Sequence, residues 1–162
     1  MAHKQALSLS PQTLRSAPFL ELRQSFPSEI ALISPFVDQL ILFIAKCRNQ
    51  EDSGLGIEMA LREALANAIV HGNQKDPHKL VHVKCRCTTD GVVSITVQDE
   101  GQGFDSNAVP DPTTPENLLV KHGRGIYLMK TLMDEVRFEQ RGALVYMRKK
   151  PNARSAAERK AG

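Results

Sequence analysis

"KLVHVKCRCTTDGVVSITVQD", residues 79–99, decides how this chain folds. Apolar and polar residues alternate along both halves of the stretch, which is the pattern of two half-buried strands. Between the halves stand Asp90 and Gly91, a pair of residues typical of a tight turn. The stretch therefore predicts an antiparallel β-hairpin, and the rest of the sheet is expected to form around it.

The sequence before the hairpin predicts one more strand and two helices. "FLELRQSF" alternates like a strand, and two later stretches carry apolar residues at helical spacing. Gly72 and Asn73 provide a stop for the second helix. The predicted elements are a strand at 19–26, a helix from Pro27 or Ser34 to Cys47, and a helix from about Leu55 to His71.

After the hairpin the pattern changes twice. Residues 99–122 are rich in glycine, proline and aspartate, which predicts a long loop, and loops of this length inside a domain are usually functional. Residues 125–136 then predict a helix, and residues 136–150 a second hairpin that turns near Arg141 and Gly142. The expected fold class is α+β: a two-layer sandwich of an antiparallel or mixed β-sheet with helices on one face.

Composition bounds the class of protein. The chain has 162 residues, 41% of them hydrophobic and 24% charged, as expected for one globular domain. We expect a cytoplasmic protein without a membrane span or signal peptide, with a flexible N-terminus at 1–15, the domain at 16–149 and a flexible basic tail at 150–162. A net charge of +3, without a recognition pattern, predicts no direct binding of nucleic acid.

Cysteine use favours a packing role. Cys85 and Cys87 alternate along a predicted strand and therefore point to the same face. No second pair of cysteines or histidines stands at metal-ligand spacing. We expect both thiols, reduced in the cytoplasm, to lie in the core or on the sheet.

Three stretches carry candidate chemistry, the first of them in "EALANAIVHG", residues 63–72. Glu63 and Asn67 are four residues apart and share a helix face, with His71 one turn further on. Asparagine has a low helix propensity, so Asn67 costs helix stability, and a functional role would explain why it is there. An amide oxygen can ligate Mg²⁺, and a carboxylate one turn earlier can take a proton from an attacking hydroxyl. The alternative is a plain polar helix face.

The second stretch is "DEGQGFD", residues 99–105, at the end of a predicted strand. A buried Asp99 could accept a hydrogen bond from the exocyclic amine of adenine, while Gly101 and Gly103 let the backbone turn close to the base. A simple glycine turn or a calcium loop are the alternatives. The calcium reading lacks the terminal glutamate and enough acidic ligands.

The third stretch is "KHGRGIYLMKTLMDEV", residues 121–136, in which Gly123 and Gly125 are predicted to precede a helix. Amides at a helix start bind anions, and glycines allow phosphate oxygens to come close. A single GxG is weak evidence. The order of the three stretches is more specific, because together they form one nucleotide-site arrangement.

In these stretches and their order, about residues 15–149 resemble the GHKL, or histidine-kinase-like, ATPases with the Bergerat ATP-binding fold. "EALANAIVHGN", "DEGQGFD" and "GRGIYLMKTLMDEV" are most similar to the stand-alone anti-sigma-factor serine kinases. The resemblance implies an ATP- and Mg²⁺-dependent kinase that phosphorylates a serine or threonine of an anti-anti-sigma (STAS) protein. It also implies binding of a sigma factor in many members, and a homodimer, for which the first strand and helix are the place to look.

The resemblance also implies residue roles. Glu63 would be the general base, Asn67 the magnesium ligand and Asp99 the adenine anchor. The other implied nucleotide contacts are His71, Gly101, Gly103, Phe104, Lys121, Gly123, Arg124, Gly125 and Ile126. Lys121 departs from the family, which often has an arginine there, and lysine cannot make the same bidentate contact.

Two other functions stay open at this point. The chain could be an ATP-binding module that sequesters a partner with little or no phosphotransfer, or the ATPase part of a split sensor kinase. Val70 stands where histidine kinases commonly have a lysine, and no histidine sits in a phosphoacceptor context. Both features point away from a sensor kinase.

Overall fold

The computed structural model describes residues 19–48, 54–103 and 121–152, with the side chains of Lys121 and His122 left aside. Its strands and helices follow the order predicted from sequence. The elements are β1 (Phe19–Pro27), a 3-10 turn (Ile30–Leu32), α1 (Ile33–Arg48), α2 (Leu55–Asn67), a π-helical turn (Ala68–Gly72), β2 (Leu80–Thr88), β3 (Val93–Gln98), α3 (Lys121–Leu132), β4 (Glu135–Glu139), a second 3-10 turn (Gln140–Gly142) and β5 (Leu144–Lys149).

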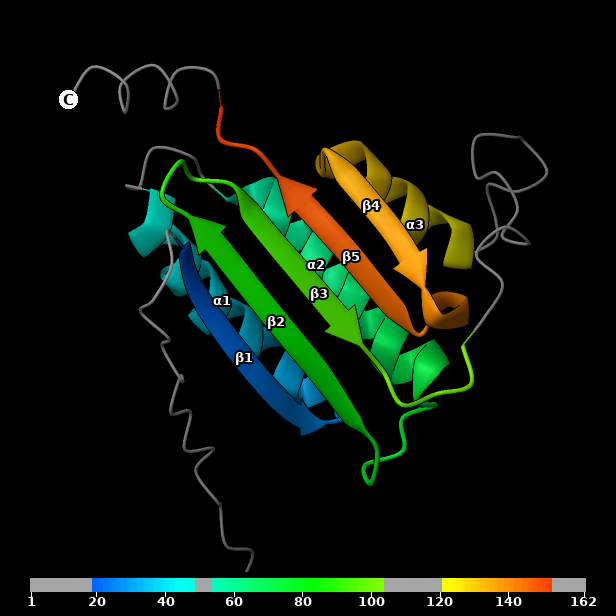
Figure 1. Ribbon diagram of the computed structural model, residues 1–162. Coiled ribbons are helices and arrows are strands. Elements are labelled where there is room, and N and C mark those ends of the chain that lie inside the picture. The colour runs from blue at the N-terminus through cyan, green and yellow to red at the C-terminus, as the bar shows by residue number, and fades with distance from the viewer. Residues whose placement is uncertain (1–18, 49–53, 104–120, 153–162) are drawn as a thin grey trace, which may run out of the picture.

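The five strands form one antiparallel sheet in the order β1-β2-β3-β5-β4. The three helices lie behind the sheet in Figure 1, so one sheet face is covered and the other is open. This confirms the predicted α+β class and both hairpins. The hairpin that decides the fold pairs Cys85 with Ile95 and turns at Asp90 and Gly91.

The core lies between the sheet and the helices. Alternate residues of β2 and β3 are buried there, among them Val83, Cys85 and Ile95, and α1 and α2 supply Leu40 and Leu61. Each side of the sheet therefore has the character that the alternation predicts. Cys85 and its neighbour in the pattern, Cys87, are free thiols in this core, as expected.

The end of α2 differs from the prediction of one α-helix to His71. After Asn67 the chain makes a π-helical turn, in which the N–H of Asn73 donates to the carbonyl of Ala68 at 2.8 Å. Asn73 is fully buried, and its side-chain amide donates to Ser28 Oγ at 2.6 Å and to the Leu80 carbonyl at 2.8 Å. These bonds join distant segments, so local sequence does not report them. Turns of this kind occur frequently at functional sites.

The helix predicted at 125–136 begins and ends earlier in the chain than expected. It begins at Lys121 and ends at Leu132, while Glu135 and Val136 already belong to β4. Gly123 and Gly125 therefore lie within the first two turns of α3, where both are buried. Packing of α3 outweighs the poor helix propensity of glycine.

Three predictions fall on other parts of the chain. The loop predicted at 99–122 is described only at its ends, and the segment 1–15 and residues 153–162 of the basic tail lie outside the described residues. Among the described residues, one helix, Ile30–Arg48, is long and apolar enough to cross a membrane by length and composition. Its inner face packs in the core, as with any buried helix, which makes the length criterion weak evidence.

Candidate nucleotide site

Asp99 lies buried just after the end of β3, with 8% of its surface exposed. Its own N–H donates to the Ala143 carbonyl at 2.9 Å, and its Oδ1 accepts the N–H of Gly101 at 2.8 Å. Burial raises the pKa of this carboxyl, although the Gly101 bond and the charge of Lys79 act in the opposite direction. The result is a fixed carboxylate at a sheet end, available as a hydrogen-bond acceptor.

The glycines around Asp99 are required by the chain itself. A Cβ on Gly72 would lie 2.3 Å from Asp99 Cγ, and a Cβ on Gly101 would lie 2.1 Å from the Gly72 carbonyl oxygen. Gly103 has φ +79°, and a Cβ there would meet the Arg141 carbonyl at 2.3 Å. The sequence attributed Gly101 and Gly103 to the approach of a base, whereas the structure gives each a close contact with backbone. The π-helical turn brings Gly72 to this contact.

Glu63 and Asn67 lie together on the side of α2 that faces α3. A Cβ on Gly125 of α3 would lie 2.6 Å from Glu63 Oε2 and 3.7 Å from Asn67 Nδ2. Both polar side chains are half-buried. Gly125 therefore leaves the room that the two side chains occupy, a contact that the sequence did not predict.

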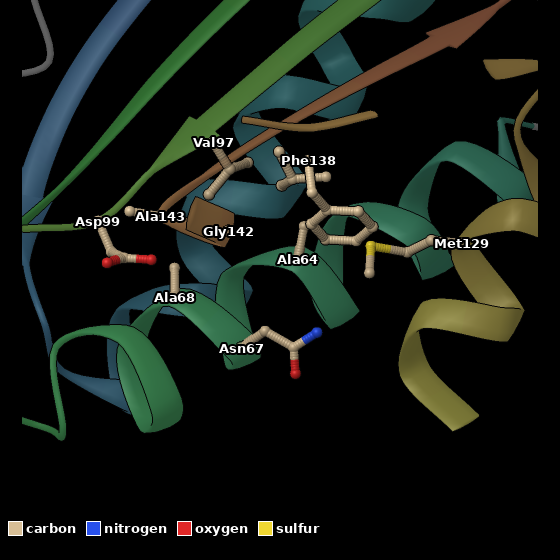
Figure 2. Close-up of a pocket in the computed structure, with 10 residues that line it drawn as sticks. Ala64, Asn67, Ala68, Val97, Asp99, Met129, Phe138, Gly142 and Ala143 are labelled. Carbon is tan, nitrogen blue, oxygen red and sulfur yellow. The ribbon is translucent and has the colours of Figure 1, made fainter. Parts of the chain in front are cut away.

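A pocket opens between α2, β3, α3 and the β4–β5 hairpin, and Asn67 and Asp99 both line it (Figure 2). Its volume is about 20 Å³, or about 280 Å³ when all the space between its walls, open solvent included, is counted. Figure 2 shows Ala64 of α2 and Ala68 of the π-helical turn on the side that faces the sheet, with Ala68 below Ala143. The lining residues are Ala64, Asn67, Ala68, Val97, Asp99, Met129, Phe138, Gly142, Ala143 and Val145.

Most of these lining residues have no local signal in the sequence. Met129, Phe138 and Ala143 look like ordinary apolar residues of a helix and a hairpin, and the packing of α3 on α2 and the sheet order bring them to the pocket. The one signal in the sequence is the turn near Gly142, whose position was predicted without a function. An apolar pocket with a few polar groups is the usual form of a small-ligand site.

The remaining predicted contacts, near the start of α3, differ in how deeply they are buried. Gly123 is buried, Arg124 is exposed, and Ile126 is 8% exposed within the core cluster rather than in the pocket lining. For Lys121 only the backbone, at the first residue of α3, is described. The expectation that the glycines precede the helix is thus wrong.

Two further predicted contacts stand apart. His71 is exposed and lies in the π-helical turn, where a spacing of four residues no longer keeps side chains on one face. Its predicted place beside Glu63 and Asn67 therefore does not follow from spacing. Phe104 lies outside the described residues.

The donor chemistry fits a magnesium nucleotide. The Asn67 amide offers one hard oxygen, and no group of three or more histidine, cysteine or acidic side chains able to hold a metal occurs among the described residues. Mg²⁺ is usually bound through one or two protein oxygens, with phosphates and water completing its shell. One amide ligand is consistent with a cation that arrives with its nucleotide.

Comparison with known proteins agrees with this geometry. The family model "Histidine kinase-like ATPase domain" matches residues 26–149, a range that includes Glu63, Asn67 and Asp99. The chain is also similar to curated relatives named anti-sigma F factor. It is 33% identical over 114 residues to the one from Heyndrickxia coagulans and 37% identical over 114 residues to that from Geobacillus stearothermophilus. Each alignment covers 66% of this chain and 76% of the relative.

The resemblance inferred from "EALANAIVHGN", "DEGQGFD" and "GRGIYLMKTLMDEV" is thereby confirmed at the level of the family. Three observations agree on one domain: the family match, the sheet with its helices on one face, and the pocket beneath the β4–β5 hairpin. This chain therefore belongs to the family of histidine kinase-like ATPase domains, and within it is similar to the anti-sigma F factors.

Proposed function

We propose that this protein is an ATP-dependent serine/threonine-protein kinase and anti-sigma factor, which acts in the cytoplasm on an anti-anti-sigma (STAS) partner. One observation carries the proposal: Glu63 and Asn67 share the α2 face that Gly125 leaves open, beside the pocket that Asn67 and Asp99 line. The names of the relatives support the anti-sigma role.

Each residue has a separate role in this proposal. Asp99 accepts a hydrogen bond from the exocyclic amine of adenine at the inner end of the pocket. The Asn67 oxygen holds Mg²⁺, which neutralises phosphate charge during transfer. Glu63 accepts the proton of the partner's hydroxyl group while the hydroxyl oxygen bonds to the γ-phosphorus and ADP leaves.

The glycines at 123 and 125 would let phosphate oxygens approach α3 near its beginning, where helix amides favour anions. The side chains at 121 and 124 are our candidates for positive charge near the γ-phosphate. His71, Gly101, Gly103, Phe104 and Ile126 stay predicted nucleotide contacts.

The test separates a kinase from a sequestering module. Glu63→Ala should still bind Mg-ATP, because the base acts only in the transition state. Its phosphotransfer to a STAS protein should fall by about a hundredfold to ten-thousandfold, as for a lost general base. Asn67→Ala, the matched variant one turn away, should instead lose the magnesium-dependent part of ATP affinity in calorimetric titration.

Rapid-quench measurement with γ-labelled ATP gives the rate. If Glu63→Ala transfers phosphate as fast as the parent, the kinase assignment of this helix is wrong. If the parent chain binds a sigma factor and ATP but phosphorylates no STAS protein, the alternative of an ATP-binding sequestering module replaces the proposal.

We further propose a homodimer through β1 and α1. β1 is an edge strand, and Ile30 and Leu42, at the start and on the outer side of this helical segment, are 52% and 63% exposed. Exposed apolar side chains and an edge strand are both typical of an interface. Leu42→Glu should shift the mass measured by light scattering from dimer to monomer, whereas Leu55→Glu, at a similarly exposed site on α2, should not. A Leu42→Glu protein that keeps the mass of the parent excludes this interface.

A further inference from the structure

A serine, a histidine and a glutamate form a chain of hydrogen bonds on the open face of the sheet, away from the nucleotide pocket. Ser25 of β1 and His82 of β2 are directly opposite in the antiparallel register. Ser25 Oγ lies 2.7 Å from His82 Nδ1, and His82 Nε2 lies 3.0 Å from Glu100 Oε1. A nucleophile, a base and an acidic residue that orients the base are the parts of a nucleophilic site.

The acceptor at one end fixes the tautomer of the imidazole. An ionised carboxylate only accepts hydrogen bonds, so Nε2 of the neutral ring carries the proton and its N–H donates a hydrogen bond to Glu100. Nδ1 is then left as the acceptor for the Ser25 hydroxyl. This is the tautomer in which His82 can take the proton of Ser25 as a general base.

Glu100 is itself held in place. Its Oε2 accepts the N–H of Leu80 at 2.9 Å, and its own N–H donates to Asn73 Oδ1 at 2.8 Å. The bonds from Leu80 and His82 lower the pKa of the Glu100 carboxyl, which keeps it ionised at neutral pH. The orienting group therefore has a fixed position and a charge, although it lies at the surface.

Two cations stand one step along the same strands. Arg23 and Lys84 are directly opposite each other, two residues from Ser25 and His82 and on the same face. Two residues of strand span about 7 Å. Like charges at directly opposite positions destabilise a sheet. Glu21 binds Arg23 Nε at 2.5 Å, whereas Lys84 has no ion pair with any residue in the described ranges.

A groove of about 290 Å³ connects the two features on the open sheet face, which faces the viewer in Figure 1. That size suits a small ligand. Ser25 and His82 lie toward one end of the groove, and Arg23 and Lys84 lie one row further along. Its lining residues are Arg23, Gln24, Ser25, His82, Val83, Lys84, Thr96, Gln98 and Leu144.

We propose that this face is a second active site, at which Ser25 hydrolyses small carboxylic esters that carry a negative charge on the acyl chain. The charge of the substrate lies at Arg23 and Lys84, and the ester carbonyl lies at Ser25. The spacing along the strand selects an anion a few bonds from the carbonyl carbon. Ser25 and His82 are the catalytic residues, and Glu100 is a positioning residue that acts through His82.

The reaction has two steps. Ser25 Oγ bonds to the carbonyl carbon while its proton passes to His82 Nδ1, and the ester C–O bond breaks as the alcohol leaves with that proton. A water molecule then attacks the acyl-serine, His82 takes a proton from the water and returns it to Ser25 Oγ, and the carboxylic acid departs. One ester and one water yield one acid and one alcohol.

The probe is the mono-4-nitrophenyl ester of glutaric acid, compared with 4-nitrophenyl pentanoate, which has the same chain length and no charge. Without nucleotide, we expect the full-length protein to release nitrophenolate from the charged ester about a hundredfold faster than Ser25→Ala does. Ser94→Ala, which removes a hydroxyl from the same sheet face, is the matched control and should equal the parent. Mass spectrometry of the quenched reaction should find the acyl group on Ser25.

Three further variants separate the roles. Lys84→Gln should raise KM for the charged ester alone. Glu100→Ala should lower kcat at unchanged KM, and Glu100→Gln should recover part of the loss, because its carbonyl still accepts the Nε2 proton. Circular dichroism and thermal unfolding verify that each variant is folded. If folded Ser25→Ala hydrolyses both esters as fast as the parent and no acyl group is found on Ser25, the hydrogen-bond chain is only a surface pairing and the proposal is overturned.

Discussion

Gly125→Ala should separate the activity of this protein from its stability. The added Cβ would lie 2.6 Å from Glu63 Oε2, about 0.8 Å short of the 3.4 Å at which ordinary contact begins. The nearest obstacle is the end of a flexible side chain, so Glu63 retreats and the backbone keeps its place. Alanine is meanwhile better than glycine within a helix by about 1 kcal/mol.

We therefore expect the Tm to stay the same or to rise by a few degrees, about 2–4 °C per kcal/mol for a chain of this size. A shift of about 1 Å at a reacting group can cost about a hundredfold in rate. Phosphotransfer to a STAS protein, followed by rapid quench with labelled ATP, should fall by about that factor.

Gly56→Ala is the matched control, because a Cβ at Gly56 meets Leu132 at 3.7 Å, an ordinary contact. It should leave the rate of phosphotransfer unchanged. A Gly125→Ala protein that is folded and transfers phosphate at the parental rate would refute the reasoning, since the position of Glu63 would then not matter for the reaction.

Two other predictions concern the buried end of β3. Because burial raises the pKa of Asp99 above 3.8, the stability that its protonated form gives at low pH is lost as the pH rises through the raised pKa. Asp99→Asn should thus be more stable than the parent at pH 7 in urea unfolding, and the difference in the free energy of unfolding should shrink toward pH 4. Calorimetry should show weaker binding of ATP. A variant that is less stable than the parent at pH 7 contradicts the raised pKa of Asp99. Gly101→Ala places a Cβ 2.1 Å from the Gly72 carbonyl oxygen, which belongs to backbone, so it should lower the free energy of unfolding by about 1–3 kcal/mol, and an unchanged urea midpoint would show that the backbone can yield.

The strands were predictable because each pairs with a neighbour whose alternation is visible in the sequence. The Asp90–Gly91 turn and the alternation around it predicted the hairpin with errors of one residue, and the apolar spacing predicted α1 to within one residue when it starts at Ser34 and not at Pro27. The π-helical turn was not predictable. It depends on bonds of Asn73 to Ser28 and Leu80, which lie in other segments.

The candidate site divides in the same way. Asn67 could be selected because asparagine is unfavourable inside a helix, Glu63 because it lies one turn before Asn67, and Asp99 because two glycines follow it at a strand end. The contact of Gly125 with Glu63, the place of Gly72 against Asp99 and the lining residue Phe138 depend on how distant elements pack, and a single sequence has no local signal for them. For the same reason only the strand register brings Ser25 and His82, separated by 57 residues, opposite each other.

The π-helical turn also limits how the length of this chain can vary. Such a turn corresponds to an α-helix with one residue inserted, so the loss of one codon within 68–72 would leave a continuous α-helix. Every residue after the deletion would be rotated by about 100° about the helix axis. Gly72 would leave Asp99, and Asn73 would leave Ser28. A substitution in this turn can be accommodated by local repacking. A deletion instead rotates the helical residues that follow about the helix axis, and repacking of neighbouring side chains cannot reverse that rotation.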